Sequence, residues 1–525
     1  METRRNFLKT VGLGVAAMAV QGCAWGQTAP AGRPNIVLIM ADDMGFSDVG
    51  CYGGEIETPN IDALAQNGVR FTHIYNNAKC GPTRASLLTG LYEQQVGDRR
   101  MKNAVTIAEV LKGAGYRTLM TGKWHLARLP VQRGFDRHFG LLSGASNHFN
   151  PGVKRPGEKA PGIKMDDLKR RWAVEDKIHW PYTPEDKDFY TTDAFTDYAL
   201  DYLDEYGAEN NPFFLYVAYT APHYPIQARP ADIAKYRGKY RIGWDVIRER
   251  RYKRLVEMGL IDKRWKMPPR DKDVPSWDSI KSEVERDEWD LKMSVYSAMI
   301  DRVDQNVGRI VDKLHQLGKF DNTLIIFLSD NGGTAEVIHR TPDIPPGPME
   351  SYRTVDLNWA NASNTPFRRY KAWDHEGGIT TPLIAHWPGE IKNRGEITHG
   401  VGHVIDIMAT CVDVSGAKYP ETYDGFDVLP LKGKSLLPLM KGCTRKGHEA
   451  IFWAFGKSKA VRKGKWKLVK NGESPWELYD MESDRTELNE LSDKYPARVK
   501  EMAALHADWV KKCEEDSAKE WGRFK

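Results

Sequence analysis

Three short apolar runs, rich in β-branched and aromatic residues, stand out from the mixed pattern of the chain. They cover residues 35–40, 213–218 and 323–328, and each predicts a strand that is buried on both faces of a largely parallel sheet. Between them, apolar residues at 295–317 recur at spacings of three or four, which predicts an amphipathic helix on one face of that sheet. We therefore expect an α/β fold with a large, mostly parallel central sheet between layers of helices.

The pattern changes near residue 446. Short apolar runs at 451–455, 459–462, 466–469 and 476–480 are separated by turn residues, which predicts an antiparallel meander, and a helix at about 497–513 is expected to pack on it. We expect a catalytic domain over residues 32–445 and a smaller α+β domain over 446–525. Residues 150–190 are predicted to form an irregular segment, and the charged run 248–254 is predicted to form a solvated helix face.

Polar residues follow each of the three predicted strands. Asp42 and Asp43 follow the first, His223 follows the second, and Asp330 and Asn331 follow the third. The carboxyl ends of parallel strands meet at one edge of a sheet, where ligands bind in such folds. These side chains are therefore expected to converge on one crevice.

The acidic residues of this group predict a metal site. Asp42, Asp43, Asp330 and Asn331 offer only hard oxygen ligands, which favour Ca²⁺ over Mg²⁺ and disfavour zinc. Three converging carboxylates without a cation would repel one another. An alternative reading of Asp42 and Asp43 is a helix cap after a strand, but the matching polar pair at Asp330 and Asn331 favours a metal.

Composition narrows the class of partner. The chain has 525 residues, of which 76 are Lys or Arg and 71 are Asp or Glu, giving a formal net charge of +5. This balance argues against nucleic-acid binding, although a local basic pocket for an anionic substrate is compatible with it.

The first 31 residues resemble an export signal. Arg4 and Arg5 precede an apolar stretch at 11–20, in the order of a twin-arginine signal, and that stretch is too short to span a bilayer. Cys23 lies in a loose lipoprotein cleavage box, whereas Ala29 and Ala31 offer a rival cleavage site. We expect an exported protein, periplasmic or lipid-anchored at the cell envelope of a bacterium.

The cysteines do not form a metal-binding or redox pattern. None of the six stands in a C-x-x-C pair, which argues against a zinc ribbon. Cys51, Cys411, Cys443 and Cys513 are expected to be mostly free thiols.

The run from Cys80 to Gly90, with Pro82 and Arg84 at fixed offsets, resembles the maturation signature of the type I, formylglycine-dependent sulfatases of the alkaline phosphatase superfamily. An alternative for Cys80 alone is a buried structural cysteine before a turn. Further segments are similar to motifs of the same family: 34–45, 115–126, 220–223, 329–333, and Lys371 ahead of 376–378. The resemblance implies a sulfuric ester hydrolase.

The same resemblance implies a mechanism. A formylglycine-generating enzyme would oxidise Cys80, and a hydroxyl of the resulting hydrate would attack sulfur, forming a sulfated covalent intermediate that collapses to the aldehyde. Cys80 would also lie at the metal. The family's pattern implies that Arg84 and His125 contact the hydrate, that Lys123 binds sulfate oxygens, and that His223 and Lys371 flank the leaving oxygen. We expect Arg84 on a helix that begins near Pro82, and Lys123 and His125 on one side of an extended segment.

The substrate pocket is less defined by the sequence. His148 belongs either to the pocket or to a loop, and Trp373 is placed near the pocket because it lies two residues beyond Lys371. Trp124 and Trp359 would either stack on sugar rings or fill the core. The expected substrate is the sulfate ester of an alcohol or phenol, with a sulfated carbohydrate favoured over a small sulfate ester, and the loops at 140–190, 229–290 and 334–370 are expected to select it.

Two other functions are compatible with such a fold. One is a phosphate or phosphonate ester hydrolase, although relatives with two zinc ions usually carry Asp-His at positions 330 and 331, where this chain has Asn331. The other is an inactive protein that binds sulfate or carbohydrate, which the full set of candidate catalytic residues argues against.

Overall fold

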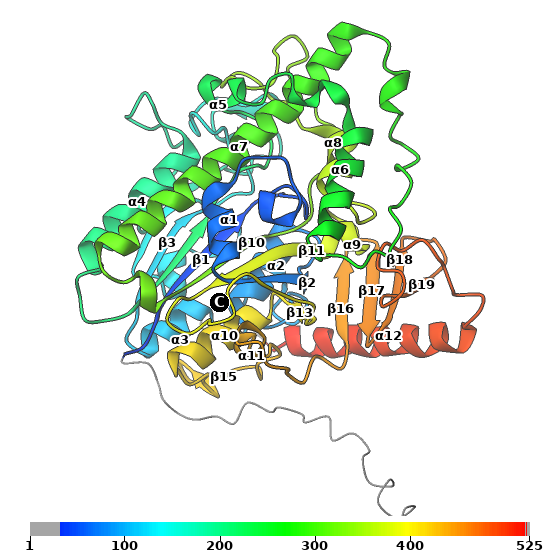
Figure 1. Cartoon of the computed structure of the whole chain (residues 1–525). Helices are drawn as coiled ribbons and strands as arrows, with labels where there is room; N and C mark the ends of the chain where they lie inside the picture. The colour runs from blue at the N-terminus through cyan, green and yellow to red at the C-terminus, as the bar shows by residue number, and fades with distance from the viewer. Residues whose placement is uncertain (1–31, 520, 522–525) are drawn as a thin grey trace, which may run out of the picture.

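The computed structural model describes residues 32–519 and 521. The predicted export signal and Cys23 lie outside these residues. An eleven-stranded sheet forms the centre of the molecule, and five of its strands, β10, β1, β9, β3 and β4, run parallel to one another (Figure 1). In spatial order the strands are β12 Glu396–Thr398, β2 Val69–Tyr75, β11 Thr380–His386, β10 Thr323–Ser329, β1 Asn35–Ala41, β9 Phe213–Ala218, β3 Arg117–Gly122, β4 Arg137–Leu141, β7 Trp172–Val174 and β8 Lys177–His179, with β13 Gly402–His403 also paired to β2.

Helices cover both faces of this sheet. Because side chains alternate along a strand, Val37 and Ile39 of β1 pack in one apolar cluster and Ile36 and Leu38 in the other. The first cluster includes α1 Pro59–Gln66, α4 Thr191–Tyr206 and α7 Glu283–Gln316, and the second includes α2 Cys80–Thr89, α3 Ile107–Gly113 and α10 Asp406–Ser415. The predicted α/β sandwich is confirmed.

Helix α7 is longer than its apolar pattern predicts. It has 34 residues and begins after Ser282, whose hydroxyl accepts a hydrogen bond from the Glu285 amide. Its first turns are polar, with Val284 81% exposed, so the hydrophobic period that predicts residues 295–317 is missing there. The remaining helices of the main body are α5 Pro230–Ala234, α6 Trp244–Glu257, α8 Asp356–Ser363, α9 Glu376–Ile379 and α11 Leu437–Met440.

The carboxy-terminal meander is also confirmed. Strands β16 Ile451–Phe455, β17 Ser458–Lys463, β18 Trp466–Asn471 and β19 Glu477–Asp480 form a four-stranded antiparallel sheet in sequence order. Helix α12 Pro496–Ser517 packs across it (Figure 1). Met502 of this helix belongs to one apolar cluster with Val461, Leu468 and Leu478. The domain boundary at residues 445 and 446 stays a prediction.

Two expectations about irregular and charged segments were wrong. Residues 150–190 contain strands β7 and β8, which extend the central sheet, and the pair β5 Glu158–Ala160 and β6 Ile163–Lys164. The run 248–254 is not uniformly solvated, because Arg251 is buried and forms ion pairs with Asp48 at 2.7 Å and Glu55 at 2.8 Å. A further two-stranded pair consists of β14 Thr422–Tyr423 and β15 Phe426–Asp427.

Three of the four cysteines expected to be mostly free are free and buried, namely Cys51, Cys411 and Cys513, whereas Cys443 is disulfide-bonded. Trp124 and Trp359, for which the sequence left sugar stacking and core packing open, are fully buried in the core. None of the helices in the described part of the chain is long and apolar enough to cross a bilayer.

Candidate functional site

The register of the parallel strands brings the predicted site residues to one edge of the sheet. Ala41 of β1 lies beside Ser329 of β10, so Asp42 and Asp330 leave the sheet next to each other. Strand β9 ends beside β1 and leads to His223, and β3 ends beside β9 and leads to Lys123. The predicted convergence at the carboxyl ends of these strands is therefore observed.

Four buried polar side chains form the floor of the site, those of Asp42, Asp43, Asp330 and Asn331. The Asp43 amide donates to Asp330 Oδ1 at 3.2 Å, and Asn331 Nδ2 donates to Asp43 Oδ1 at 2.7 Å. Ligand atoms of Asp42, Cys80 and Asp330 lie within 4.8 Å of one another, as do those of Asp42, Asp43 and His223. This arrangement brings three carboxylates into one water-excluded space.

The arrangement fits a bound cation. Among the described residues, the buried atoms Asp42 Oδ1 and Asn331 Oδ1 have no hydrogen-bond partner. Burial, followed by the negative charge of Asp330, raises the pKa of Asp42 well above its ordinary value. A cation beside these oxygens would satisfy both orphaned atoms and remove the repulsion, and the oxygen donors suit a hard ion.

Cys80 stands at the start of helix α2, next to this floor. The helix begins at Cys80, within two residues of the expected start near Pro82, and Pro82 fits within the first turn, where its missing N–H is not needed. Cys80 Sγ lies 3.2 Å from His125 Nδ1. One turn later, Arg84 donates to Asp330 Oδ2 at 2.8 Å and to the Lys123 carbonyl at 2.8 Å.

Two lysines face the aspartates. Lys123 Nζ lies 2.5 Å from Asp42 Oδ2, and Lys371 Nζ lies 2.7 Å from Asp43 Oδ2. Burial opposes the charge of Lys371, but the nearby negative groups, led by Asp43, together outweigh it and raise the pKa of Lys371 well above its ordinary value. Burial likewise opposes ionisation of Asp43, yet Lys371 and His223 hold the pKa of that carboxyl below its usual range. This lysine and aspartate are therefore a charged pair.

Both histidines of the site are held neutral. Burial and the nearby charge of Lys123 lower the pKa of His125 well below its ordinary value. Burial lowers the pKa of His223 in the same direction, against the attraction of Asp43, whose Oδ2 lies 3.5 Å from His223 Nε2. A neutral imidazole next to Cys80 can accept a proton.

The backbone around His125 differs from the prediction. His125 has φ +54°, in the left-handed region, so the segment from Lys123 is not extended at that residue. Both side chains still reach the site, because the left-handed turn brings the ring of His125 back toward α2.

The two predicted substrate-pocket residues have different surroundings. His148 is buried, with Nδ1 2.8 Å from Thr191 Oγ1 and Nε2 3.1 Å from the His223 carbonyl, so neither ring nitrogen is available to a ligand. It therefore lies behind His223. Trp373 is half-buried, and the Arg369 guanidinium lies 4.5 Å from its ring centroid.

Two further residues near the site were not predicted from the sequence. Arg99 Nη1 lies 3.5 Å from His125 Nε2, and a Cβ at Gly81 would be 2.6 Å from Arg99 Cδ, so the glycine permits the arginine to pack against the start of α2. Glu336 lies 3.7 Å from Lys371 and 3.7 Å from Lys79. Arg99 lies in the short 3-10 helix Asp98–Arg100 and Glu336 lies in a loop, and neither segment has a periodic pattern or a motif, so no sequence signal marks them.

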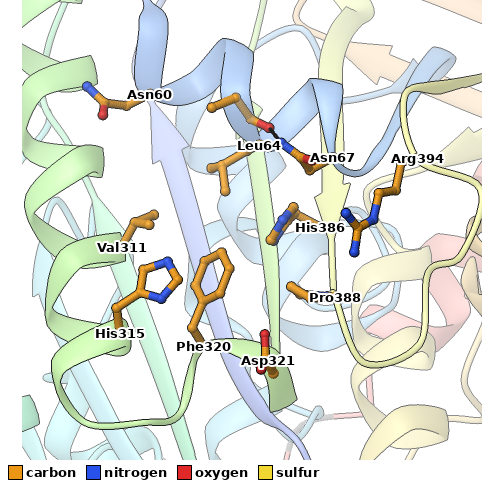
Figure 2. Close-up of a pocket in the computed structure, with 11 residues that line it drawn as sticks. Asn60, Leu64, Asn67, Val311, His315, Phe320, Asp321, His386, Pro388 and Arg394 are labelled. Carbon is orange, nitrogen blue, oxygen red and sulfur yellow. Dashed lines mark hydrogen bonds between the residues drawn. The ribbon is translucent and has the colours of Figure 1, made fainter.

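Two cavities differ in their relation to this site. A cleft of about 760 Å³ opens beside His125 and is lined by segments 98–100, 142–144 and 164–171. A second cavity, of about 390 Å³, lies beyond the amino end of β10, at the opposite edge of the sheet, where His315 stacks on Phe320 near His386 (Figure 2). The second cavity contains none of the predicted site residues.

Comparisons with known proteins agree with this geometry. A family model described as Sulfatase matches residues 34–417, and one described as N-sulphoglucosamine sulphohydrolase, C-terminal, matches residues 369–515. The chain is 32% identical to the arylsulfatase of Klebsiella aerogenes, over 77% of this chain and 91% of that protein. It is 29% identical to the N-acetylgalactosamine-6-sulfatase of Sus scrofa, over 79% of this chain and 68% of that protein.

A solved structure has the same architecture. The crystal structure of Ps i-CgsB in complex with k-i-k-neocarrahexaose superimposes with a TM-score of 0.65 at 27% identity, covering 91% of this chain and 93% of that chain.

Proposed function

Because this chain belongs to the sulfatase family, and is therefore a sulfuric ester hydrolase, we propose that it desulfates a carbohydrate and that its nucleophile is a formylglycine made from Cys80. The position of Cys80 Sγ carries the proposal: it lies 3.2 Å from His125 and shares a cluster with Asp42 and Asp330. A formylglycine hydrate supplies a hydroxyl nucleophile that can release sulfate by re-forming its carbonyl, an exit that serine or unmodified cysteine lacks.

The surrounding side chains have distinct proposed roles. His125, held neutral, accepts a proton from the hydroxyl at position 80, and Arg84 and Lys123 bind anionic oxygens. His223 and Lys371 approach the same oxygen of Asp43, so they share one side of the site. We assign protonation of the leaving alcohol oxygen to one of these two residues.

We propose that the cation is Ca²⁺, with Mg²⁺ as the weaker candidate. Asp42, Asp43, Asp330 and Asn331 would hold it, next to position 80, since their oxygen donors suit a hard ion of high coordination number. Its chemistry there is to neutralise negative charge on the sulfate group.

The substrate proposal has support from the relatives. The Sus scrofa relative is named for a sulfated amino sugar, and the structure of Ps i-CgsB contains a carrageenan-type oligosaccharide. We also propose export to the periplasm or to the cell envelope, on the sequence of residues 1–31 alone. A formylglycine-generating enzyme is the partner required for maturation.

Mass spectrometry of the peptide around residue 80, combined with turnover of an aryl sulfate, tests the nucleophile. We expect turnover to rise in proportion to the fraction of aldehyde when the protein is produced with a formylglycine-generating enzyme. Cys80→Ser should lower turnover by roughly a thousandfold or more, whereas Cys513→Ala, at a buried free cysteine of α12, should retain it.

Three results would contradict the proposed function. Full turnover by protein with an unmodified thiol, or by Cys80→Ser, would contradict the proposed nucleophile. Faster hydrolysis of the phosphate ester of the same phenol would contradict the preference for sulfate.

A further inference from the structure

The cleft beside His125 is unusually basic. Only two of its lining side chains are acidic, Asp98 and Asp167, whereas five are basic: Arg99, Arg100, Lys164, Lys169 and Arg171. All seven are exposed. These charged side chains come from the 3-10 helix Asp98–Arg100 after α2 and from residues 164–171, which begin in β6 and lead toward β7. Residues 125–127 and 142–144 complete one concave surface of about 760 Å³.

Both carboxylates of the cleft are already paired. Asp98 lies 3.4 Å from Arg99, and Asp167 lies 2.8 Å from Lys159. Within residues 32–519 and 521, no carboxylate lies at ion-pair distance from Arg100, Lys164, Lys169 or Arg171. Lys169 Nζ instead lies 3.8 Å from the centroid of the Trp180 ring. Cations gathered in a concave surface without counter-charges attract anions.

The cleft is continuous with the catalytic centre. His125 lines it and also lies 3.2 Å from Cys80 Sγ, while Arg99 reaches the other ring nitrogen of His125. Gly144 packs against the same ring, since a Cβ there would be 3.0 Å from it. When the reacting sulfate of an oligosaccharide lies at position 80, the neighbouring sugars of that oligosaccharide therefore lie close to this cleft.

We propose that the cleft binds a second anionic group, a sulfate ester or a carboxylate, on a sugar next to the one that reacts. This inference rests on the proposed function, because it requires a carbohydrate sulfate at position 80. Arg100 and Arg171 present planar guanidinium groups, which pair with two oxygens of one sulfate or carboxylate. The enzyme thus selects oligosaccharides with at least two anionic groups over those with one.

Binding measurements in a Cys80→Ala background test this without hydrolysis. The probes are three tetrasaccharides: a carrageenan fragment with sulfate only, an oligogalacturonate with carboxylate only, and neutral maltotetraose. We expect Arg100→Ala/Arg171→Ala to bind at least one anionic probe tenfold or more weakly than the parent, as measured by calorimetry. The probe that loses affinity identifies sulfate, carboxylate or both as the recognised group.

Matched controls separate this effect from a general loss of positive charge. Arg250→Ala/Lys511→Ala removes two exposed cations on α6 and α12, and should bind the anionic probes like the parent. Equal binding of the anionic probes by the cleft variant and the parent, or an equal loss in the control, would overturn the proposal. Wild-type protein that binds these probes through the cleft but hydrolyses no sulfate ester would overturn the proposed function and leave the cleft site intact.

Discussion

Two adjacent aspartates of this site have pKa values that are shifted in opposite directions. Asp42 and Asp43 are both fully buried, yet burial and Asp330 raise the pKa of Asp42, whereas Lys371 and His223 keep the pKa of Asp43 low against the effect of burial. The difference arises from partners far away in the sequence. Asp42 is thus the carboxylate that gains most from a cation.

Calcium should stabilise chelator-treated protein. Binding to the folded state alone contributes about 2.7 kcal/mol when free calcium reaches a hundred times the dissociation constant. Asn331→Ala removes one orphaned oxygen, so we expect it to need roughly ten to a hundred times more calcium for the same rise in melting temperature. Asn393→Ala, at an exposed position, is the control. An identical calcium response in the two variants would contradict the site.

A buried carboxyl outside the site offers a pH test. Burial raises the pKa of Asp374 to about 7, and among the described residues neither carboxylate oxygen has a hydrogen-bond partner. Because the folded pKa exceeds the unfolded value, the stability from its protonated form is full below pH 3.8 and is lost as pH rises to about 7. Asp374→Asn should match wild type near pH 4 and exceed it by about 4 kcal/mol at pH 8. Urea unfolding across this range measures the difference, and a constant difference would contradict the assignment.

At the scale of secondary-structure elements, the sequence predicts best where local pattern and burial agree. Buried apolar strands determine where the chain leaves the sheet, so Asp42, His223 and Asp330 could be predicted to converge. Arg251 could not, because its charged neighbours on α6 have the pattern of a solvated face and only tertiary contacts reveal its acidic partners. The left-handed turn at His125 has no sequence signal either.

The ion pairs of Arg251 should hold α6 against the loop that follows β1. Arg251→Met leaves Asp48 buried without its partner, so we expect a loss of about 3–5 kcal/mol in the free energy of unfolding. Arg250→Met, at an exposed neighbouring position, should change it by less than about 0.5 kcal/mol. Denaturant unfolding of both variants decides this, and similar values for the two would show that the buried pair contributes little.

For the molecule as a whole, a buried network connects the carboxy-terminal sheet to the central one. Glu376 lies on α9, directly before β11, and its Oε1 is 2.9 Å from Lys467 Nζ of β18. Lys467 also pairs with Glu487 at 2.8 Å, and Arg485 with Glu376 at 2.8 Å. Because Lys371 lies five residues before Glu376, this network also restrains the segment that carries a proposed catalytic residue.

Lys467→Met should therefore weaken both stability and turnover. It leaves Glu376 and Glu487 buried with one cation fewer, so we expect a loss of about 3–5 kcal/mol and faster proteolysis after residue 446. Lys459→Met, on the exposed side of β17, is the control.

The pH dependence of the same variant distinguishes the ion pair from lost packing. Burial opposes ionisation of Glu376, but Lys467 and Arg485 lower its pKa to about 2. Because this folded pKa lies below the unfolded value of 4.5, the stabilisation is present above pH 4.5 and is lost as pH falls toward 2. The difference between wild type and Lys467→Met should therefore shrink on acidification. A difference that stays constant between pH 6 and pH 3 would mean that the lysine acts through its aliphatic stem and not through its charge.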